Sequence, residues 1–266
     1  MAEIEPVVSA TAAAIWRGLE QTRNRHEDHP RLSASSLGDE CSRKLWYDFR
    51  WVQAGEQFDG RKLSIFDTGN VWEDRLVAYL TGAGISVEAN DPSTGEQWRV
   101  VFAAGHASGR TDGKVVGVPE APVTVHVLEI KSHNNKSFGE VKRKKVREGK
   151  PMHYAQMQTY MHHQGLSRAL YLAVNKNDDD LYVERIEYDA TFALNLVAKA
   201  ERIVMAASPP AKLHEDPEAK MAFQCRFMCR HRGVCHDGAS VRRTCRSCLH
   251  ATAEMDGEGR WSCDRH

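Results

Sequence analysis

The sequence lacks any long hydrophobic run, because no stretch approaches the ~18 consecutive apolar residues of a membrane-spanning helix. Its first residues, Met1 to Val8, lack the basic segment and the apolar segment of a secretory signal and carry Glu3 and Glu5 instead. We therefore expect no membrane association and a cytoplasmic, reducing location.

The chain also lacks an excess of charge of either sign, since 36 Lys and Arg balance 36 Asp and Glu. A zero net charge argues against a strongly basic protein that coats DNA. The charge is nevertheless uneven, and two basic patches could meet phosphates, although each could also be a solvated face. One patch is the run Lys142, Arg143, Lys144, Lys145, Arg147 and Lys150. The other is interleaved with cysteines and comprises Arg226, Arg230, Arg232, Arg242, Arg243 and Arg246.

Internal repeats and low-complexity tracts are absent as well, and 41% hydrophobic with 27% charged residues is ordinary for a soluble globular protein. A chain of 266 residues accommodates one large domain with a small appendage. We expect the large domain at residues 1–240 and a cysteine-rich tail at 241–266.

Hydrophobic periodicity predicts an α/β fold in which helices flank a central mixed sheet. Helices are expected over Pro6–Asn24, from the Ser33–Ser36 caps through Cys41 to Trp51, and over Thr68–Thr81, Met152–His163 and Thr191–Ala206. A loop with Gly55 and Gly60 should precede the third helix. Strands are expected over Ile85–Glu88, Trp98–Ala104, Gly109–Val118 and Val123–Ser132, as a mostly antiparallel meander, and over Ala169–Asn175 and Leu181–Tyr188.

The predicted strand that ends at Ser132 carries Glu129 and Lys131 on one face, because strand side chains alternate. An exposed ion pair is the alternative interpretation. Glu73 lies on a helix face with Leu76 and Leu80, so its carboxylate should point toward the core and needs a partner such as a cation.

Two further features stand near this pair in the predicted fold. Asp112 precedes Gly113, a dipeptide that also forms plain hairpin turns. Gln156 and Tyr160 are four residues apart on one helix face, where simple packing is the alternative.

Seven cysteines in a reducing compartment favour metal ligation over disulfides, and an odd number cannot pair completely. Cys41 near the start and Cys225, Cys229 and Cys235 near the end supply the four thiolates that an iron-sulfur cluster or a zinc ion needs. His231 and His236 could replace a thiolate in a zinc site, and free structural cysteines remain a third alternative.

The tail contains a second candidate site. Cys245 and Cys248 are separated by two residues, as are Cys263 and His266, and this paired spacing is typical of tetrahedral zinc. With Trp261 as its small core, the tail should depend on metal for its stability. It could be purely structural or could contact DNA.

The order of these acidic and amide motifs resembles the PD-(D/E)XK nuclease superfamily, and within it the RecB-like exonucleases, over roughly residues 35–237. The motifs are Glu73, Asp112, Glu129-x-Lys131 and Gln156-x3-Tyr160. The resemblance implies a restriction-endonuclease-like core that hydrolyses DNA with Mg²⁺ or Mn²⁺. Many relatives with an iron-sulfur cluster have His where this chain has Glu73, which implies a more acidic metal shell here.

The resemblance also implies a role for each residue. The metal ligands would be Glu73, Asp112, Glu129 and the carbonyl of Ile130. Lys131 would orient or deprotonate the attacking water, while Gln156 and Tyr160 would contact the DNA backbone or support the metal-bound phosphate. The basic run Lys142 to Lys150 would hold backbone phosphates.

The cysteine pattern resembles the iron-sulfur staple of RecB-like nucleases such as the AddB subunit and the CRISPR adaptation nucleases. It departs from them in its first gap, where Cys225 and Cys229 enclose three residues rather than two. The resemblance implies a structural [4Fe-4S] cluster, with zinc as the alternative.

The function that follows is a metal-dependent exonuclease acting on linear or single-stranded DNA in recombination, repair or phage DNA processing, in a bacterium or a phage-infected host. Its partner would be the DNA backbone, with little sequence specificity, and recombination or replication proteins could join it. The alternatives are a non-catalytic DNA-binding or assembly module and a structure-specific endonuclease.

Overall fold

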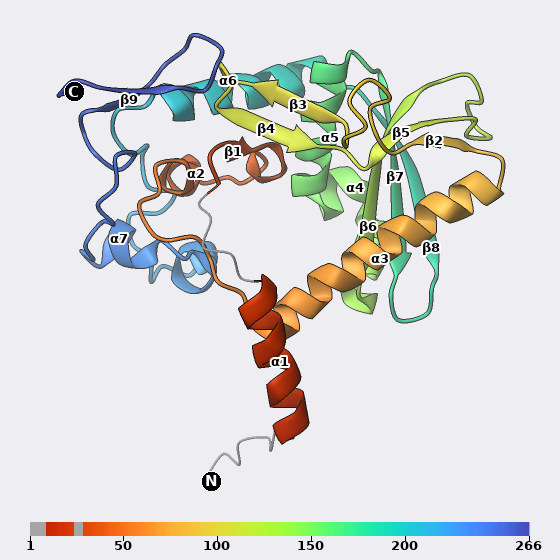
Figure 1. The fold of residues 1–266 in the computed structure, drawn as a ribbon, viewed down its shortest axis with the longest axis horizontal. Coiled ribbons are helices and arrows are strands. Elements are labelled where there is room, and N and C mark those ends of the chain that lie inside the picture. Colours follow the sequence, from red (N-terminus) through yellow and green to blue (C-terminus); the bar gives the residue numbers. More distant parts are fainter. Residues whose placement is uncertain (1–8, 24–28, 266) are drawn as a thin grey trace.

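The computed structural model describes residues 9–23 and 29–265, and over these residues the chain has a mixed α/β fold (Figure 1). The N-terminal half contains α1 (Ala10–Arg23), β1 (Leu32–Ser33), the 3-10 turn η1 (Ala34–Ser36), α2 (Ser42–Phe49), α3 (Gly60–Gly82), β2 (Ser86–Glu88), β3 (Arg99–Phe102), β4 (Ala107–Arg110), β5 (Gly113–Val116) and β6 (His126–His133). The C-terminal half contains α4 (Asn135–Gly149), α5 (Pro151–Gln164), β7 (Arg168–Asn175), β8 (Leu181–Glu187), α6 (Ala190–Met205), the π-helical turn η2 (Gln224–Met228), α7 (Arg232–His236), β9 (Ala251–Ala253) and β10 (Trp261–Cys263).

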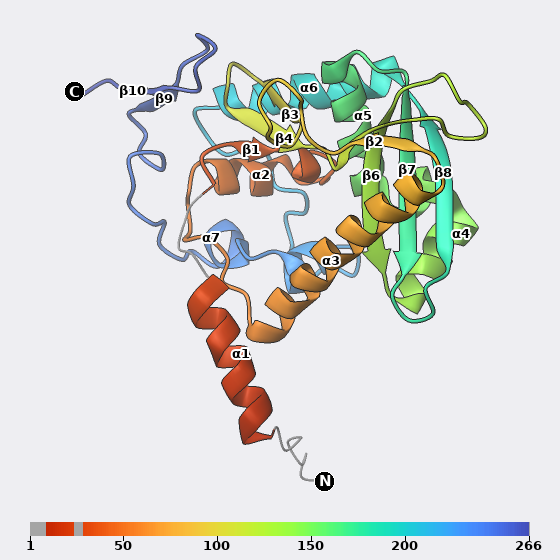
Figure 2. The same cartoon turned by 45° about the vertical axis from the view of Figure 1, so that its right-hand side comes forward.

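The main sheet has five strands in the order β2-β5-β6-β7-β8, and β6 pairs with β7 in parallel while the other pairs are antiparallel. The expected mixed sheet is therefore present. One face packs against α3, where Leu76 meets Leu128 and Ile130, and the other packs against α4 and α5. Figure 2 shows α3 lying obliquely across the sheet. Because β6 and β7 are covered on both faces, their side chains are mostly buried.

The predicted meander is wrong in one respect, since its strands divide between two sheets. Strands β1, β4 and β3 form a separate three-stranded sheet in which β1 and β4 are parallel. The predicted strand Gly109–Val118 is really β4 and β5, interrupted at Thr111 and Asp112. Gly113 adopts a φ of 145° there, and a Cβ would lie 2.9 Å from the carbonyl oxygen of Glu88, so glycine permits the change of sheet. Asp112 consequently lies at the junction of the two sheets.

The helix predicted from Thr68 begins eight residues earlier, at Gly60. Asp59 caps it by accepting a hydrogen bond from the backbone N of Lys62 at 2.7 Å. Gly60 was expected in a loop, but a Cβ there would come within 2.4 Å of the carbonyl oxygen of Trp16, so glycine serves the close approach of α1. Helix α1 agrees with its prediction where it is described; the outermost predicted residues, 6–8 and 24, lie outside the described part.

Two other helices differ from expectation. The Ser33–Ser36 segment forms only β1 and a 3-10 turn, and Cys41 itself caps α2. Helix α4 was not predicted, and it carries the basic run on a segment whose buried face comprises only Phe138, Val141, Val146 and Gly149. Its regular geometry breaks at Lys145, where φ is 60°. The sparse and interrupted apolar spacing explains why periodicity did not indicate a helix.

The C-terminal part of the chain packs around α2. The indole of Trp46 donates to the carbonyl of Ala206 at 2.8 Å, and the Arg43 guanidinium donates to Pro210 at 2.7 Å. The β9-β10 hairpin of the tail lies against the same helix, because the Trp261 ring is 5.1 Å from that of Phe49. Residues more than 150 positions apart thus form one local core around α2.

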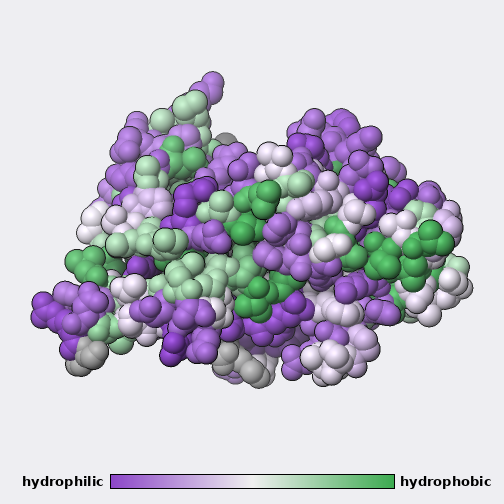
Figure 3. All heavy atoms as spheres, turned by 90° about the horizontal axis from the view of Figure 1, so that it is seen from above, coloured by the Kyte–Doolittle hydropathy of each residue, from purple (hydrophilic) through white to green (hydrophobic). Residues whose placement is uncertain are grey.

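Exposed hydrophobic side chains are scattered over the described surface. On the face seen from above, hydrophobic residues form patches between hydrophilic ones (Figure 3). Among the described helices, none is long and apolar enough to cross a membrane.

Candidate active site

Strand β6 places Glu129 and Lys131 on the same face, where the two side chains form an ion pair. Asp112 approaches from the start of β5, and its Oδ2 accepts a hydrogen bond from the backbone N of Ile130 at 2.7 Å. Because β5 and β6 are antiparallel neighbours, the sheet register brings a residue 18 positions upstream beside the Glu129-Ile130-Lys131 segment.

Glu73 completes this group from helix α3. Its carboxyl is half-buried, and burial followed by the charge of Asp112 raises its pKa to about 7, while Lys131 acts in the opposite direction. These mutual effects place Glu73, Asp112 and Lys131 in one electrostatic environment. The structure therefore brings together the four acidic and lysine residues that the sequence singles out.

Glu129 is the least accessible member of the group, with 0% of its surface exposed. Burial, opposed by Lys131 and reinforced by Asp112 and Glu73, raises its pKa to about 7. Its Oε2 accepts no hydrogen bond from any described residue. Burial alone would lower the pKa of Lys131, but the surrounding carboxylates, Glu129 first, raise it, so the ammonium stays protonated.

The donor set fits a divalent cation in kind. Three carboxylates share one protonated lysine, and a buried carboxylate oxygen without a partner is the group that a hard cation would stabilise. Within residues 9–23 and 29–265, however, no three His, Cys, Asp or Glu side chains stand in a ready-made arrangement for a metal ion. Two of the carboxylates are engaged by protein groups instead. Asp112 accepts a hydrogen bond from the backbone N of Ile130, and Glu129 forms the ion pair with Lys131.

Gln156 and Tyr160 lie on the buried face of α5, and the Gln156 amide donates to the Tyr160 hydroxyl at 3.1 Å. Tyr160 is 2% exposed and packs so closely on β4 that a Cβ at Gly109 would lie 2.6 Å from its ring. Burial, together with the negative charges of Glu129 and Asp112, raises the pKa of its hydroxyl, which indicates that Tyr160 lies near these carboxylates. Both side chains are therefore buried in the core.

Three neighbouring residues were missed in the sequence. His133 follows Glu129 and Lys131 in the same alternation on β6, Tyr171 pairs with Glu129 across the β6-β7 ladder, and His153 precedes Gln156 by three residues on α5. The Tyr171 hydroxyl lies 2.8 Å from His133 Nε2 and 2.9 Å from His153 Nδ1. The alternation could have identified His133, and helical spacing His153, but nothing in the sequence indicated the hydroxyl between them.

The predicted DNA-binding run lies on α4, and most of its members are ion-paired. Lys142 contacts Asp180 at 2.8 Å, Lys144 and Lys150 contact Glu140, and Arg147 contacts Asp189 at 3.5 Å. Among the described residues, the members without an ion pair are Arg143 and Lys145, and both are exposed. Lys150, which follows the last residue of α4, is the member whose charge lowers the pKa of His133 and His153.

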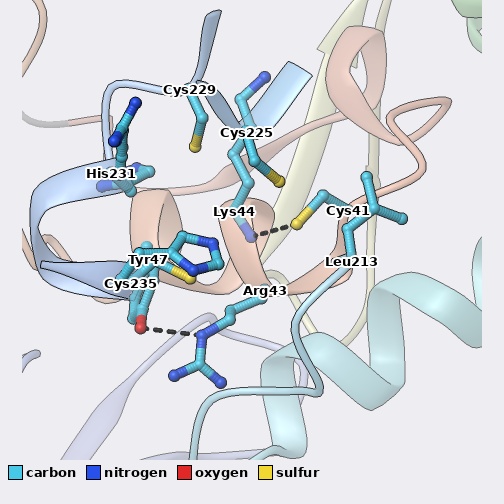
Figure 4. Close-up of a pocket in the computed structure, with 11 residues that line it drawn as sticks. Cys41, Arg43, Lys44, Tyr47, Leu213, Cys225, Cys229, His231 and Cys235 are labelled. Carbon is cyan, nitrogen blue, oxygen red and sulfur yellow. Dashed lines mark hydrogen bonds between the residues drawn. The ribbon is translucent and has the colours of Figure 1, made fainter. Parts of the chain in front are cut away.

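The four cysteines of the predicted cluster line one pocket between α2, η2 and α7. Figure 4 shows their side chains around this pocket: Cys41, Cys225, Cys229 and Cys235. Cys41 caps α2, and its Sγ accepts from the backbone N of Lys44 at 3.4 Å. Burial and the neighbouring thiols Cys41 and Cys235 raise the pKa of Cys225, because thiolates close together repel one another. A bound metal group would offset this repulsion.

His231 also lines this pocket, and Asp48 lies behind it. His231 is fully buried, its Nε2 lies 2.8 Å from Asp48 Oδ1, and its Nδ1 has no hydrogen-bond partner among the described residues. Arg230 also binds Asp48. Asp48 was missed in the sequence because its contacts with residues 230 and 231 join opposite ends of the chain.

The tail brings two of its predicted zinc ligands into one turn, where the backbone N of Cys248 donates to the carbonyl of Cys245 at 3.2 Å. Cys263 ends β10 and pairs with Ala251 across the hairpin. The fourth predicted ligand, His266, lies outside the described residues.

No protein-family model and no curated protein matches this sequence. Among solved structures, the alkaline exonuclease LHK-Exo from Laribacter hongkongensis is similar at 16% identity and a TM-score of 0.45, covering 66% of this chain and 87% of its own. The same enzyme in complex with dAMP is similar at 14% identity and a TM-score of 0.46, and the match covers 65% of this chain and 86% of that enzyme's chain. The protein SSO0001 is similar at 14% identity and a TM-score of 0.46, and the match covers 86% of this chain and 96% of the SSO0001 chain. At these values, function has to be argued from the residues of the site.

Proposed function

We propose that the protein is a divalent-metal-dependent deoxyribonuclease of the PD-(D/E)XK type that acts as an exonuclease. The observation that carries the proposal is the convergence of Glu73, Asp112 and Glu129 on Lys131 from α3, the β4-β5 junction and β6. Phosphodiester hydrolysis needs acidic ligands for a divalent cation and a positive group beside the phosphate, and this set supplies both.

The carboxylates of Glu73, Asp112 and Glu129, with the carbonyl of Ile130, would hold Mg²⁺ or Mn²⁺. The cation supplies a bound water of lowered pKa and screens the charge that develops on the phosphate. Lys131 keeps its proton in this environment, so it acts as a hydrogen-bond donor that orients the attacking water and a phosphate oxygen. Gln156 and Tyr160, hydrogen-bonded to each other on the buried face of α5, would support the metal-bound phosphate from behind these groups.

DNA would reach the site across α4. Arg143 and Lys145 are exposed there and available for backbone phosphates, whereas the ion-paired lysines would have to exchange an acidic partner for a phosphate. Contacts of this kind predict strong salt dependence and little sequence preference.

Cleavage assays on three DNA forms test the function directly. We expect a linear duplex or single strand with a labelled end to be degraded with Mg²⁺ or Mn²⁺ and to persist in EDTA, while a covalently closed circle stays intact. Cutting of the circle would instead indicate an endonuclease. Salt-sensitive DNA binding without any cleavage would indicate a non-catalytic DNA-binding module.

The same carboxylates predict how pH changes stability. The pKa values of Glu73 and Glu129 are near 7 in the folded protein against 4.5 for the free groups, so the folded state keeps protons that the unfolded state releases. The free energy of unfolding of the metal-free protein should therefore fall as pH rises through this window. Mg²⁺ should raise the Tm more at pH 8 than at pH 5. Thermal unfolding at both pH values, with and without the ion, measures this, and an equal effect at both would contradict it.

For the cysteine pocket we favour a [4Fe-4S] cluster over zinc. A single zinc ion holds its thiolates at about 2.3 Å, hence close to one another, whereas a cluster holds its four thiolates around a larger body. Four thiols line the pocket, the number that such a cluster needs. A zinc ion in the tail would use Cys245, Cys248, Cys263 and His266.

A further inference from the structure

A continuous line of hydrogen bonds runs from helix α4 to helix α5 through the sheet beside Lys131. Ser137 Oγ lies 2.9 Å from His133 Nδ1, and His133 Nε2 lies 2.8 Å from the Tyr171 hydroxyl. The same hydroxyl lies 2.9 Å from His153 Nδ1. Four side chains from four elements are thereby joined in one chain, which we call the Ser137-His153 chain.

This chain ends beside the candidate catalytic lysine. His133 is two residues beyond Lys131 on the same strand face, and Tyr171 stands opposite Glu129 across the parallel β6-β7 ladder. His153 shares a helix face with Gln156 and Tyr160, and the charge of Lys131 acts on its imidazole. His153 is thus joined through Tyr171 to the strand positions of Glu129 and Lys131.

The last atom of the chain has no protein partner. His153 Nε2, on the far side of the ring from Tyr171, makes no hydrogen bond with any described residue, and the side chain is only partly buried. The other nitrogens of both imidazoles are engaged inside the chain. A purely structural cluster would not need to end in a polar atom without a protein partner.

The hydrogen bonds of the Ser137-His153 chain can run in either of two directions. Both imidazoles are neutral, because burial and nearby lysines lower the pKa of His133 to about 4 and that of His153 to about 3. Each neutral ring has one donor and one acceptor nitrogen, and the single proton of the Tyr171 hydroxyl is used within the chain only when all bonds run the same way. Either Ser137 donates first and His153 ends as an N–H donor at Nε2, or every bond reverses and Nε2 becomes an acceptor.

A phosphate oxygen only accepts hydrogen bonds, so just one of these directions can serve a nucleic-acid backbone. We propose that His153 contacts the substrate, donating a hydrogen bond from Nε2–H to a phosphate oxygen of the bound strand, and that Tyr171 and His133 are positioning residues that fix this tautomer. The inference rests on the proposed nuclease function. It assigns a neutral donor to the site beside the charged donor Lys131, which suits a group that must release its product after cleavage.

Cleavage kinetics test the contact. We expect His153→Ala to lower kcat/KM by about 10- to 100-fold, the usual range for a lost bond to a charged acceptor, and His153→Gln to recover much of this through its amide N–H. Tyr171→Phe should cost less, because it frees the tautomer without removing the donor. The matched control is His162→Ala on the same helix, whose Nδ1 lies 2.7 Å from the Tyr188 hydroxyl in a similar pair away from Lys131. This control should retain wild-type cleavage.

A second measurement separates the contact from a loss of folding. In protein labelled with ¹⁵N-histidine and mixed with a phosphorothioate oligonucleotide in Ca²⁺, His153 should carry its proton on Nε2, and Tyr171→Phe should disturb this preference. Wild-type activity in His153→Ala, or an Nδ1–H tautomer in the complex, would overturn the inference while leaving the nuclease function intact. A wild-type protein that neither binds nor cuts DNA would overturn both.

Discussion

Replacing Lys131 by Ala should lower the rate of DNA cleavage by at least about 100-fold, the effect expected when a positioned donor to the developing charge is removed. Lys131 forms the ion pair with the fully buried Glu129, and the surrounding carboxylates keep it protonated. Its loss removes both the donor to the phosphate and the single cation within the acidic group. Initial rates on end-labelled linear DNA with saturating Mn²⁺ measure the effect.

The control must separate chemistry from folding, since Lys131→Ala leaves Glu129 without its counter-charge. Glu129→Gln removes the buried negative charge instead of leaving it unpaired. This variant should therefore fold at least as well as Lys131→Ala and still lose cleavage. Glu187→Ala on β8, which breaks a surface pair with Arg168 away from the site and from the basic run, should keep both its Tm and its catalytic rate. A Lys131→Ala protein that cuts DNA at the wild-type rate would remove the proposed mechanism.

Replacing Cys41 by Ser should produce the largest loss of stability, together with loss of bound metal. Serine is a preferred N-cap, so this variant can still cap α2 and the effect reports on the thiolate alone. Because metal binding contributes folding free energy, a decrease in Tm of about 10 °C or more is expected. Iron and zinc analysis and visible absorbance of anaerobically purified protein provide the second readout.

Cys245→Ser is the matched comparison for this experiment, because it alters only the tail. It should remove zinc without removing iron, whereas Cys41→Ser should remove iron without removing zinc. Two zinc ions and no iron in the wild-type protein would replace the proposed cluster by a zinc site. A metal-free wild-type protein with an unchanged Tm in both variants would contradict both sites.

The local parts of this fold were predictable from the sequence. Alternation places Glu129 and Lys131 on one strand face, and the spacing of Glu73 with Leu76 turns that carboxyl toward the interior. Both depend only on the geometry of a single element. The same geometry predicts α5 and the shared face of Gln156 and Tyr160.

What could not be predicted depends on pairing between distant segments. Tyr171 comes between His133 and His153 only because β6 and β7 are parallel neighbours, and no local pattern specifies that register. The division of residues 109–118 between two sheets likewise depends on which strands lie next to Gly113. Asp48 meets His231 through the folding of the whole chain.

The packing of α2 has a consequence for how the protein is made. Trp46 bonds to Ala206, the main chain at Val52 accepts from Arg242, and Phe49 stacks near Trp261. On a ribosome, the α2 segment therefore emerges long before any of these partners exists. Its aromatic side chains must wait for partners more than 150 residues further along the polypeptide, and such late, non-local contacts are slow to form and leave apolar surface open to aggregation. A polypeptide that stops before Trp261 should therefore be less soluble than the chain of 266 residues.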